Sequence, residues 1–443
     1  MSEFVRIIDP SGKTLRNDLY NSPPDTASYI IFKEGNLIKA KNGNTGQIEY
    51  KGSDALTVIN NAAADLSDGG RIYIRKGTYD IGDGTIKIYD NTVLCGDGPS
   101  TLIVQSSSTD NPVISNVDRT NGNSNLKVCD IQVKNTAPFA GPDQVCLEFE
   151  KCNNVFVQNV YIQSVYDGIE FCRSDNCTAL GCHVTALEGN TDPFGTGIEF
   201  DHMDGGNYHK VAYNYIYGFP NGILSDANQH YCIVIGNTIL SSLYYGIFMQ
   251  ILEKTPVPSH IAIIGNVILN TQTYDAIRLE HGSANFIIAG NIARNNKLHG
   301  CRIYGGESVT IIGNIFCENW YGVKLEGHEG YNTQNIVIED NILLNNSHGA
   351  INITGTPAPT NYTIRNNIGF PTESSGIATI PSGQTSVTVA HGLAGTPTSV
   401  VLGPTHAEVV DAVWSADDTN IIITVPSAVS ADRQIAWYAE YKP

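Results

Sequence analysis

Charge is scarce in this sequence of 443 residues, and most of it has one sign. Charged residues make up 16% of the chain, which disfavours long charged helices. The 44 acidic residues outnumber the 26 basic ones, for a formal net charge of −18. Because nucleic-acid phosphates need a footprint of Lys and Arg, this balance excludes a nucleic-acid partner and weighs against a strongly polyanionic ligand.

Long apolar runs and paired cysteine motifs are also missing. No apolar run reaches the roughly 18 residues that span a bilayer, so we expect no membrane span. Residues 1–6 contain no basic region followed by an apolar stretch, and we expect no encoded secretory signal. The ten cysteines include no CxxC pair, and several occupy strand-like contexts such as residues 93–95 and 315–317. Buried thiols are therefore expected, rather than disulfides or a metal site.

Internal repetition is the strongest feature that the sequence does contain. A short apolar step after a turn, close to the form Gly-Ile-x-Phe, returns every 22 to 30 residues. Its copies begin at Gly168, Gly197, Gly222, Gly246, Ala276, Gly300 and Gly322. Each copy predicts one short strand that follows a tight turn.

A second repeated motif, an alternating strand that ends in Asn, has a similar period. Its copies end at Asn159, Asn214, Asn237, Asn266, Asn291, Asn314, Asn341 and Asn367. From Asn214 onward the steps are 23, 29, 25, 23, 27 and 26 residues. Asn tolerates a left-handed backbone and can bond the same side chain one rung above, so one Asn per turn predicts a coiled solenoid.

Alternation within each rung assigns the two faces of the strands. Ile169 and Phe171 are predicted to point inward, whereas Glu170 and Cys172 point outward. The interior then becomes a stack of apolar side chains. Because rungs lie about 4.8 Å apart, outward residues at equivalent positions form columns, and function is expected on those columns.

The two ends of the chain depart from the repeat. Residues 1–52 are predicted to form a small N-terminal module or arm, and the solenoid is predicted to span residues 53–372. The solenoid begins with apolar residues at helical spacing, which predict a helix that caps the open core: Ala55, Leu56, Ile59, Ala62, Ala63 and Leu66. Five strand-like runs without the repeated Asn predict a small C-terminal β-sandwich over residues 376–443.

The opening of the solenoid resembles a known family. Residues 69–79 read Gly-Gly-Arg-Ile-Tyr-Ile-Arg-Lys-Gly-Thr-Tyr, and residues 92–98 read Thr-Val-Leu-Cys-Gly-Asp-Gly. Both are similar to the start of pectin-lyase-like proteins, a superfamily that includes polygalacturonases, polysaccharide lyases, uronan epimerases and phage tailspike depolymerases. The resemblance covers roughly residues 53–370 and implies an all-β fold, the right-handed parallel β-helix. It does not select a reaction.

Two outward columns carry the residues that suit chemistry on a saccharide. The first reads Glu170, Glu199, Leu224, Phe248, Arg278, Arg302 and Lys324. The second reads Cys172, Asp201, Asp226, Gln250, Glu280, Tyr304 and Glu326. Carboxylates gather on the early rungs and bases on the later ones, which suits a sugar chain laid across the strands and also an ordinary polar surface.

Glycoside hydrolysis needs two carboxyl groups between about 5 and 9.5 Å apart. Glu170 and Glu199 are expected one rung apart, where one pKa should rise, and Glu199 and Asp201 about 6 to 7 Å apart along one strand. The sequence therefore predicts that the catalytic acid and base come from Glu170, Glu199, Asp201 and Asp226, with their individual roles left open.

The chain leaving that strand adds His202 and Asp204, which faintly resemble the Asp-Pro-His-Asp/Glu element of alginate epimerases, although Pro is replaced and the order is shifted. Lyases and epimerases neutralise a uronate with Arg or Lys and sometimes use Ca²⁺. For that alternative the residues to consider are Arg278, Arg302 and Lys324, with solvated surface bases as the plain alternative.

The remaining predicted substrate contacts are Phe248, Glu280 and Tyr304, together with aromatic residues in or near longer insertions. Those aromatics are Phe194, Tyr208, Tyr244, Tyr245, Trp320 and Tyr331. Aromatic rings stack on sugar faces, and packing between neighbouring rungs would explain them equally well.

The sequence thus favours a glycoside hydrolase that degrades a pectin-like or other acidic or neutral polysaccharide and needs no cofactor or metal, with Ca²⁺ only for a lyase. A lyase or epimerase on the same face, a non-catalytic glycan-binding adhesin or viral spike, and a purely structural surface protein are the alternatives. An extracellular, virion or cell-surface location and assembly as a homotrimer are expected with these functions.

Overall fold

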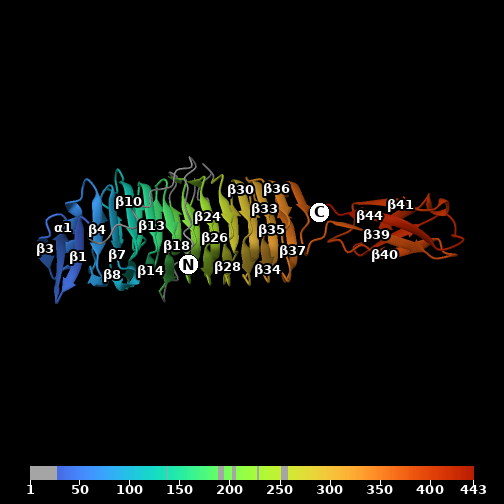
Figure 1. The fold of residues 1–443 in the computed structure, drawn as a ribbon. Coiled ribbons are helices and arrows are strands. Elements are labelled where there is room, and N and C mark those ends of the chain that lie inside the picture. Colours follow the sequence, from blue (N-terminus) through green and yellow to red (C-terminus); the bar gives the residue numbers. More distant parts are fainter. Residues whose placement is uncertain (1–26, 137, 188–193, 202–205, 227–228, 251–257) are drawn as a thin grey trace. The chain divides into compact units, whose positions relative to one another are not determined.

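Residues 27–136, 138–187, 194–201, 206–226, 229–250 and 258–443 are described by the computed structural model of the chain. They divide into two compact units, Met1–Gly189 and Asn190–Pro443, each described here by itself. Within each unit, strands far apart in the sequence lie side by side (Figure 1). None of the helices among these residues is long and apolar enough to cross a membrane.

The first unit is built from three sheets whose strands recur in a fixed order. The sheets run β3-β2-β1-β4-β7-β10-β13-β16, β5-β8-β11-β14-β17 and β6-β9-β12-β15. Their strands are β1 (Tyr29–Glu34), β2 (Leu37–Asn42), β3 (Ile48–Gly52), β4 (Gly70–Ile74), β5 (Gly77–Asp80), β6 (Ile86–Ile88), β7 (Thr92–Gly96), β8 (Thr101–Gln105), β9 (Ile114–Asn116), β10 (Ser124–Cys129), β11 (Gln132–Asn135), β12 (Leu147–Glu150), β13 (Asn153–Gln158), β14 (Tyr161–Ser164), β15 (Ile169–Cys172), β16 (Thr178–Leu180) and β17 (His183–Ala186). From β4 onward each coil of the chain adds one parallel strand to each sheet, which is the architecture of a parallel β-helix.

The second unit continues the same three-sheet pattern with its own strands. The sheets run β20-β24-β27-β30-β33-β36-β38, β21-β25-β28-β31-β34 and β18-β22-β26-β29-β32-β35-β37, and β19 pairs with β23. The strands are β18 (Thr196–Asp201), β19 (Gly206–Asn207), β20 (Lys210–Ala212), β21 (Tyr215–Tyr217), β22 (Asn221–Asp226), β23 (Gln229–His230), β24 (Ile233–Ile235), β25 (Thr238–Leu240), β26 (Tyr245–Gln250), β27 (Ala262–Ile264), β28 (Val267–Leu269), β29 (Ile277–Glu280), β30 (Ala284–Ala289), β31 (Ile292–Arg294), β32 (His299–Tyr304), β33 (Glu307–Ile312), β34 (Ile315–Cys317), β35 (Tyr321–Gly327), β36 (Gln334–Glu339), β37 (Gly349–Gly355) and β38 (Thr360–Arg365). The predicted solenoid is confirmed.

The inward faces of the rungs form the apolar core, as alternation predicted. Ile169 and Phe171 are fully buried and lie in register with Leu147 and Phe149 of the preceding rung. The rings of Phe149 and Phe171 stack with centroids 6.1 Å apart. In the third sheet of the second unit the same position carries a continuous apolar column, formed by Ile198, Ile223, Ile247, Ile277, Cys301 and Val323.

The repeated Asn residues of the second unit form a buried ladder. Each Nδ2 donates to the Oδ1 of the Asn one rung further on, over 2.9–3.0 Å, and that Oδ1 also accepts the preceding ladder residue's backbone N–H. Its members are Asn214, Asn237, Asn266, Asn291, Asn314, Asn341 and Asn367. Polar groups that turn inward at this corner are thus satisfied without water.

Two details of the Asn prediction were wrong. The left-handed residue is the one before each ladder Asn, for example Tyr213 at φ 56° and Gly290 at φ 63°, because the turn is made one position earlier than the inward-pointing amide. Asn159 itself adopts φ 50° and donates to the Asp130 carboxylate at 3.2 Å. It therefore occupies the turn position and is not a rung of the buried ladder.

A second buried amide ladder, which the sequence analysis missed, lies at the next corner. Asn296 Nδ2 donates to Asn319 Oδ1 at 3.0 Å, and the Asn319 N–H donates to Asn346 Oδ1 at 3.0 Å. The Thr271 N–H donates to Asn296 Oδ1, which continues the column by one rung. Consecutive Asn pairs at 295–296 and 345–346 were the signal in the sequence.

The predicted capping helix is present as α1 (Ala55–Ala64). Asp54 caps its N-terminus by accepting from the N–H groups of Leu56 and Thr57, each at 3.1 Å. The helix contacts β2, β3 and β6 and buries an apolar face made of Ala55, Val58, Ile59, Ala62 and Ala63. β1 pairs in parallel with β4, so residues 29–52 extend the first sheet; the division at residue 52 stays a prediction.

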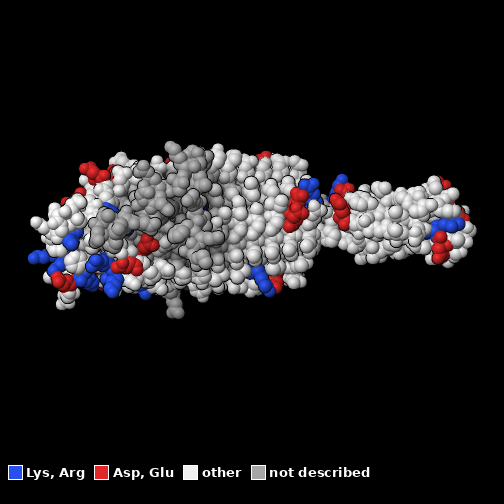
Figure 2. Space-filling model, in the orientation of Figure 1, with Lys and Arg blue, Asp and Glu red and all other residues white. Residues whose placement is uncertain are grey.

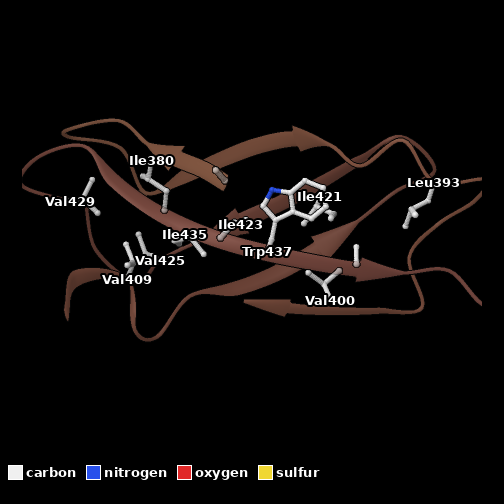
Figure 3. Packing of buried hydrophobic residues seen from close by; sticks show 12 residues of the cluster. Ile380, Leu393, Val400, Val409, Ile421, Ile423, Val425, Val429, Ile435 and Trp437 are labelled. Carbon is white, nitrogen blue, oxygen red and sulfur yellow. The ribbon is translucent and has the colours of Figure 1, made fainter. Parts of the chain in front are cut away.

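The C-terminal residues form two three-stranded antiparallel sheets, β39-β44-β41 and β40-β43-β42, as the predicted β-sandwich requires. Their strands are β39 (Glu373–Ile380), β40 (Ser386–Ala390), β41 (Ser399–Pro404), β42 (Val413–Ala416), β43 (Asn420–Thr424) and β44 (Arg433–Glu440). Between the sheets lies a separate core that includes Trp437, Ile421 and Ile435 (Figure 3). The first strand begins three residues before the expected boundary.

The buried ladder predicts a specific pattern of stability. Asn291→Ala removes one donor from Ile263 O and one from Asn314 Oδ1, and it leaves the Asn266 amide without its acceptor. We expect the free energy of unfolding to fall by about 2–4 kcal/mol, because several buried polar groups lose partners together. Asn352→Ala on β37, a half-buried position with one weak contact at 3.4 Å, should cost under about 0.5 kcal/mol in the same denaturation experiment. Equal losses would contradict a structural role for the ladder.

All ten cysteines are free thiols, and all but Cys317 are buried. Burial and the neighbouring Glu318 raise the pKa of the Cys317 thiol, although Arg294 opposes them. We therefore expect Cys317 to react first with iodoacetamide in the native protein, at a rate that rises only at higher pH than for a free thiol, because only the thiolate reacts. Mass spectrometry of the alkylated chain checks this; modification of another cysteine first would contradict it.

Candidate functional site

The outward face of the third sheet in the second unit brings one predicted column together. The strand register aligns Glu199, Leu224, Phe248, Arg278, Arg302 and Lys324 on consecutive rungs. An acidic side chain therefore precedes two apolar rungs, and three basic side chains follow them. Glu199 is only 9% exposed, so it lies within the surface rather than in open solvent.

The second predicted column is described in part. Asp226 is in register with Gln250, and Glu280, Tyr304 and Glu326 follow on later rungs. Asp201 and Asp226 end β18 and β22, and only their backbone is described. His202 and Asp204 lie outside the described residues.

A hollow of about 280 Å³ lies over the two apolar rungs of the first column. Its lining residues are Phe194, Asn221, Leu224, Tyr244, Tyr245, Phe248, Gln250 and Tyr274. The Tyr274 ring stacks on the rings of Tyr245 and Tyr244, with centroids 5.1 and 5.8 Å apart. The ring centroids of Tyr245 and Phe248 are 4.3 Å apart. Of the predicted cleft aromatics, Phe194, Tyr244 and Tyr245 line this hollow, whereas Tyr208, Trp320 and Tyr331 do not.

Arg278 borders the hollow on the side of the later rungs. Its guanidinium donates to the Tyr245 hydroxyl at 3.0 Å, pairs with Glu280, and lies over the ring of Phe248 at 5.7 Å. Burial alone would lower the pKa of Arg278, but Glu280, Tyr245 and Asp275 outweigh it and raise that pKa. Burial in turn raises the pKa of Tyr245 to about 12, so its hydroxyl stays protonated.

The other two bases of the column are also paired. Arg302 donates to Glu326 through Nε at 2.9 Å, and the Lys324 ammonium lies 3.0 Å from the same carboxylate. Burial by itself would raise the pKa of Glu326, but its hydrogen bond to Lys324 and the charge of Arg302 lower it overall. Arg302 also lies over the Tyr304 ring, 4.8 Å from its centroid. These contacts join the predicted ligands Arg302 and Lys324 in one ion-pair network through Glu326, and the ring of Tyr304 packs against it.

The sequence analysis missed two residues at the centre of that network. Asp275 has no exposed surface, accepts from His299 Nδ1 at 2.5 Å, and lies 3.7 and 4.0 Å from Arg278 and Arg302. Asp275 and His299 each directly precede the repeated Ala or Gly of their rung. Residues at this position form a third column, in which β32 and β35 align His299 with Tyr321. Polar residues just before that repeated turn were the signal, because this position also points out of the core.

The remaining predicted catalytic residue, Glu170, lies in the first unit. It is in register with Glu148 of the preceding rung, and both outward side chains are buried, with exposed fractions of 9% and 3%. Arg119 covers the preceding rung through ion pairs to Glu148 and Glu150. The outward face is thus packed here and not solvated. Glu199 belongs to the other unit, so the predicted Glu170–Glu199 pair stays a prediction.

Figure 2 shows few Lys, Arg, Asp and Glu side chains on the visible face over the strands of the second unit. Within the described segments, no group of three or more His, Cys, Asp or Glu residues is arranged to hold a metal ion. The side chains that line the hollow offer aromatic rings and carboxamide groups.

Solved structures share this fold at low sequence identity. The A-module of a mannuronan C-5 epimerase from Azotobacter vinelandii superposes with a TM-score of 0.54 at 15% identity, over 72% of this chain and 96% of that one. The catalytic unit of an alpha-1,3-glucanase from Streptomyces thermodiastaticus gives 0.58 at 14% identity, over 71% and 66%. An exopolygalacturonase from Thermotoga maritima gives 0.51 at 16% identity, over 71% and 88%.

Sequence comparison agrees with the architecture. No curated protein matches the chain. The family described as the right handed beta helix region matches residues 145–316 and 221–390, which together cover more than half of the sequence. The predicted right-handed parallel β-helix is thereby confirmed. The chain belongs to the right-handed β-helix family.

Proposed function

We propose that the protein binds a largely neutral polysaccharide across the third sheet of its second unit and hydrolyses it there. The observation that carries this proposal is the aromatic hollow, which lies between the rung of Glu199 and the rung of Arg278. An extracellular or surface location is part of the proposal, because polysaccharides of this kind are met outside the cell. Assembly as a homotrimer stays a prediction.

The lining of the hollow suits a sugar ring. Tyr245, Tyr274 and Phe248 offer apolar ring surface for the C–H faces of a pyranose, and the amide of Gln250 can exchange hydrogen bonds with hydroxyl groups. At about 280 Å³ the hollow is at the low end for ligand pockets. It therefore accommodates one or two units of a chain whose remainder runs along the open face.

The ion-pair network favours a neutral substrate over a uronate. Arg278, Arg302 and Lys324 are each paired with a protein carboxylate, Glu280 or Glu326. A uronate would have to displace those internal partners, and leaving a half-buried carboxylate without its cation is costly. Elimination and epimerisation both depend on neutralising a uronate, so this arrangement supports hydrolysis instead.

Glu199 and Asp226 are the carboxyl pair that we assign to that reaction, from the position of their backbones on the third sheet. They lie on adjacent rungs and are offset by two residues, so their Cα atoms are about 8 Å apart from the rung spacing and strand rise. Two side chains that leave the same face at this Cα distance can hold their carboxyl groups at the separation of an inverting hydrolase, in which one carboxylic acid protonates the leaving oxygen and the other carboxylate takes a proton from the attacking water. Asp201, about 6.6 Å from Glu199 along β18, is the alternative partner.

Hydrolysis is tested on a panel of neutral and uronate polysaccharides, read for new reducing ends and for the ultraviolet absorbance of unsaturated uronates. We expect reducing ends without that absorbance. Glu199→Gln and Asp226→Asn should each lower kcat by about a hundredfold or more, because they remove proton transfer. Glu329→Gln, an exposed position outside the hollow, is the matched control and should leave kcat unchanged.

The outcomes of that panel separate the candidate functions. Absorbance of unsaturated products would replace hydrolysis with elimination. Saturable binding without any product, unchanged in both carboxylate variants, would establish a glycan-binding adhesin on the same fold. Activity that survives in Glu199→Gln and Asp226→Asn would move the catalytic pair elsewhere on the protein.

Substrate affinity should depend on the aromatic lining rather than on charge. Tyr274→Ala removes the ring that stacks on Tyr244 and Tyr245, and we expect binding to weaken roughly tenfold. Tyr213→Ala, a ring with 62% exposure away from the hollow, is the control. Calorimetry at low and high salt should give similar affinities for a neutral chain, whereas a steep loss with salt would indicate a charged substrate.

A further inference from the structure

A second groove, of about 560 Å³, lies in the same unit at the corner that follows β28, β31 and β34. It crosses consecutive rungs, and none of its lining residues lines the aromatic hollow. We propose that this groove is a separate binding site for a neutral oligosaccharide, which holds the polymer without acting on it. The proposal goes beyond the hydrolytic site, since it uses other residues and involves no bond cleavage.

The amide part of the groove floor is rigid and already hydrogen-bonded within the protein. Buried Asn296 and Asn319 belong to the second amide ladder, and Asn319 Nδ2 also donates to Ala293 O at 3.0 Å. Such a floor cannot rearrange to bind a ligand, but it holds the rim residues at one-rung spacing. The groove is thus pre-formed, which lowers the entropic cost of binding.

Exposed amides line one rim. Asn270, Asn295 and Asn345 occupy left-handed turn positions at φ 62°, 56° and 57°, so backbone geometry alone accounts for Asn there. A ligand can use only those hydrogen-bond donors and acceptors of these amides that bind no other residue. Asn295 Nδ2 donates to Asn270 Oδ1 at 2.8 Å, and this bond uses neither the Nδ2 donors of Asn270 nor the Oδ1 acceptor of Asn295. The rim therefore offers both donors and acceptors, as hydroxyl groups require.

The other rim adds features that the fold does not need. Trp320 is 38% exposed although it lies in the groove lining, and its ring stacks on His348 at 4.1 Å. That contact fixes the indole as a platform, the arrangement on which sugar rings stack. Gln272 and Lys297, which directly follow the corner residues Thr271 and Asn296, also line the groove and are exposed.

Charge in the groove points to a neutral ligand. Glu318 is held by a bidentate ion pair with Arg294, at 2.8 and 2.6 Å, so the carboxylate is neutralised within the protein. One ammonium, on Lys297, remains among the lining residues. A single exposed cation is too little for a polyanion, and it can instead donate hydrogen bonds to hydroxyl oxygens.

The test measures binding of neutral oligosaccharides of glucose, galactose, mannose and xylose to the full chain, by calorimetry and by tryptophan fluorescence. At least one sugar should quench the fluorescence, and Trp320→Ala should abolish the quenching and weaken that binding roughly tenfold. Trp320→Phe should restore part of the affinity, because it keeps a ring. Trp414→Ala, which removes an indole of 39% exposure from the C-terminal sandwich, is the matched control.

Lys297→Ala, at an exposed position that tolerates change, gives a second reading if Trp320→Ala fails to fold, and it should weaken the same binding a few-fold. Wild-type affinity in Trp320→Ala and Lys297→Ala, or the absence of Trp320-dependent binding across the panel, would overturn the proposal. Failure of the hydrolytic function looks different, because Glu199→Gln abolishes product formation and leaves this fluorescence signal intact.

Discussion

Parallel hydrogen bonding between successive rungs is the constraint on which the rest of the structure depends. At each corner the chain must turn without leaving inward polar groups unpaired. Asn266, Asn291 and Asn314 meet this need because each carboxamide donates to one neighbouring rung and accepts from the other. A ladder of this kind works only if the same residue returns at the same corner. The register of the strands is therefore locked from inside the core.

That locked register decides what can meet on the outside. Residues about 25 positions apart in the chain become neighbours, and a one-residue slip would send every outward side chain into the core. Because Glu199, Phe248 and Arg278 share one column, an acid, an aromatic floor and a base follow one another along a single face. The fold thus provides a row of aligned positions, and chemistry depends on which side chains fill them.

The charged side chains at the later rungs of this face pair with one another. Arg278 and Arg302 converge on the fully buried Asp275, and Glu280 and Glu326 complete the network. Removing these groups from water is tolerable only because each finds a partner. The consequence is a face that is ordered but nearly neutral, which favours stacking and hydroxyl recognition over attraction of a charged polymer.

Much of the fold followed from local pattern. The capping helix, the inward face of Ile169 and Phe171, the Asn214–Asn367 ladder and five of the six C-terminal strands were predicted, because strand alternation and the 22 to 30-residue repeat are visible in the linear sequence. Strand β39 was not predicted. The sequence also identified the column of Glu199 and Arg278. Tertiary structure alone decided the hollow around Tyr274, the Asp275–His299 pair and the groove beside Trp320. The hollow, the ion pair and the groove depend on the side-chain rotamers at the turns and on how side chains of different rungs pack there. The period of the repeat carries no information about those rotamers.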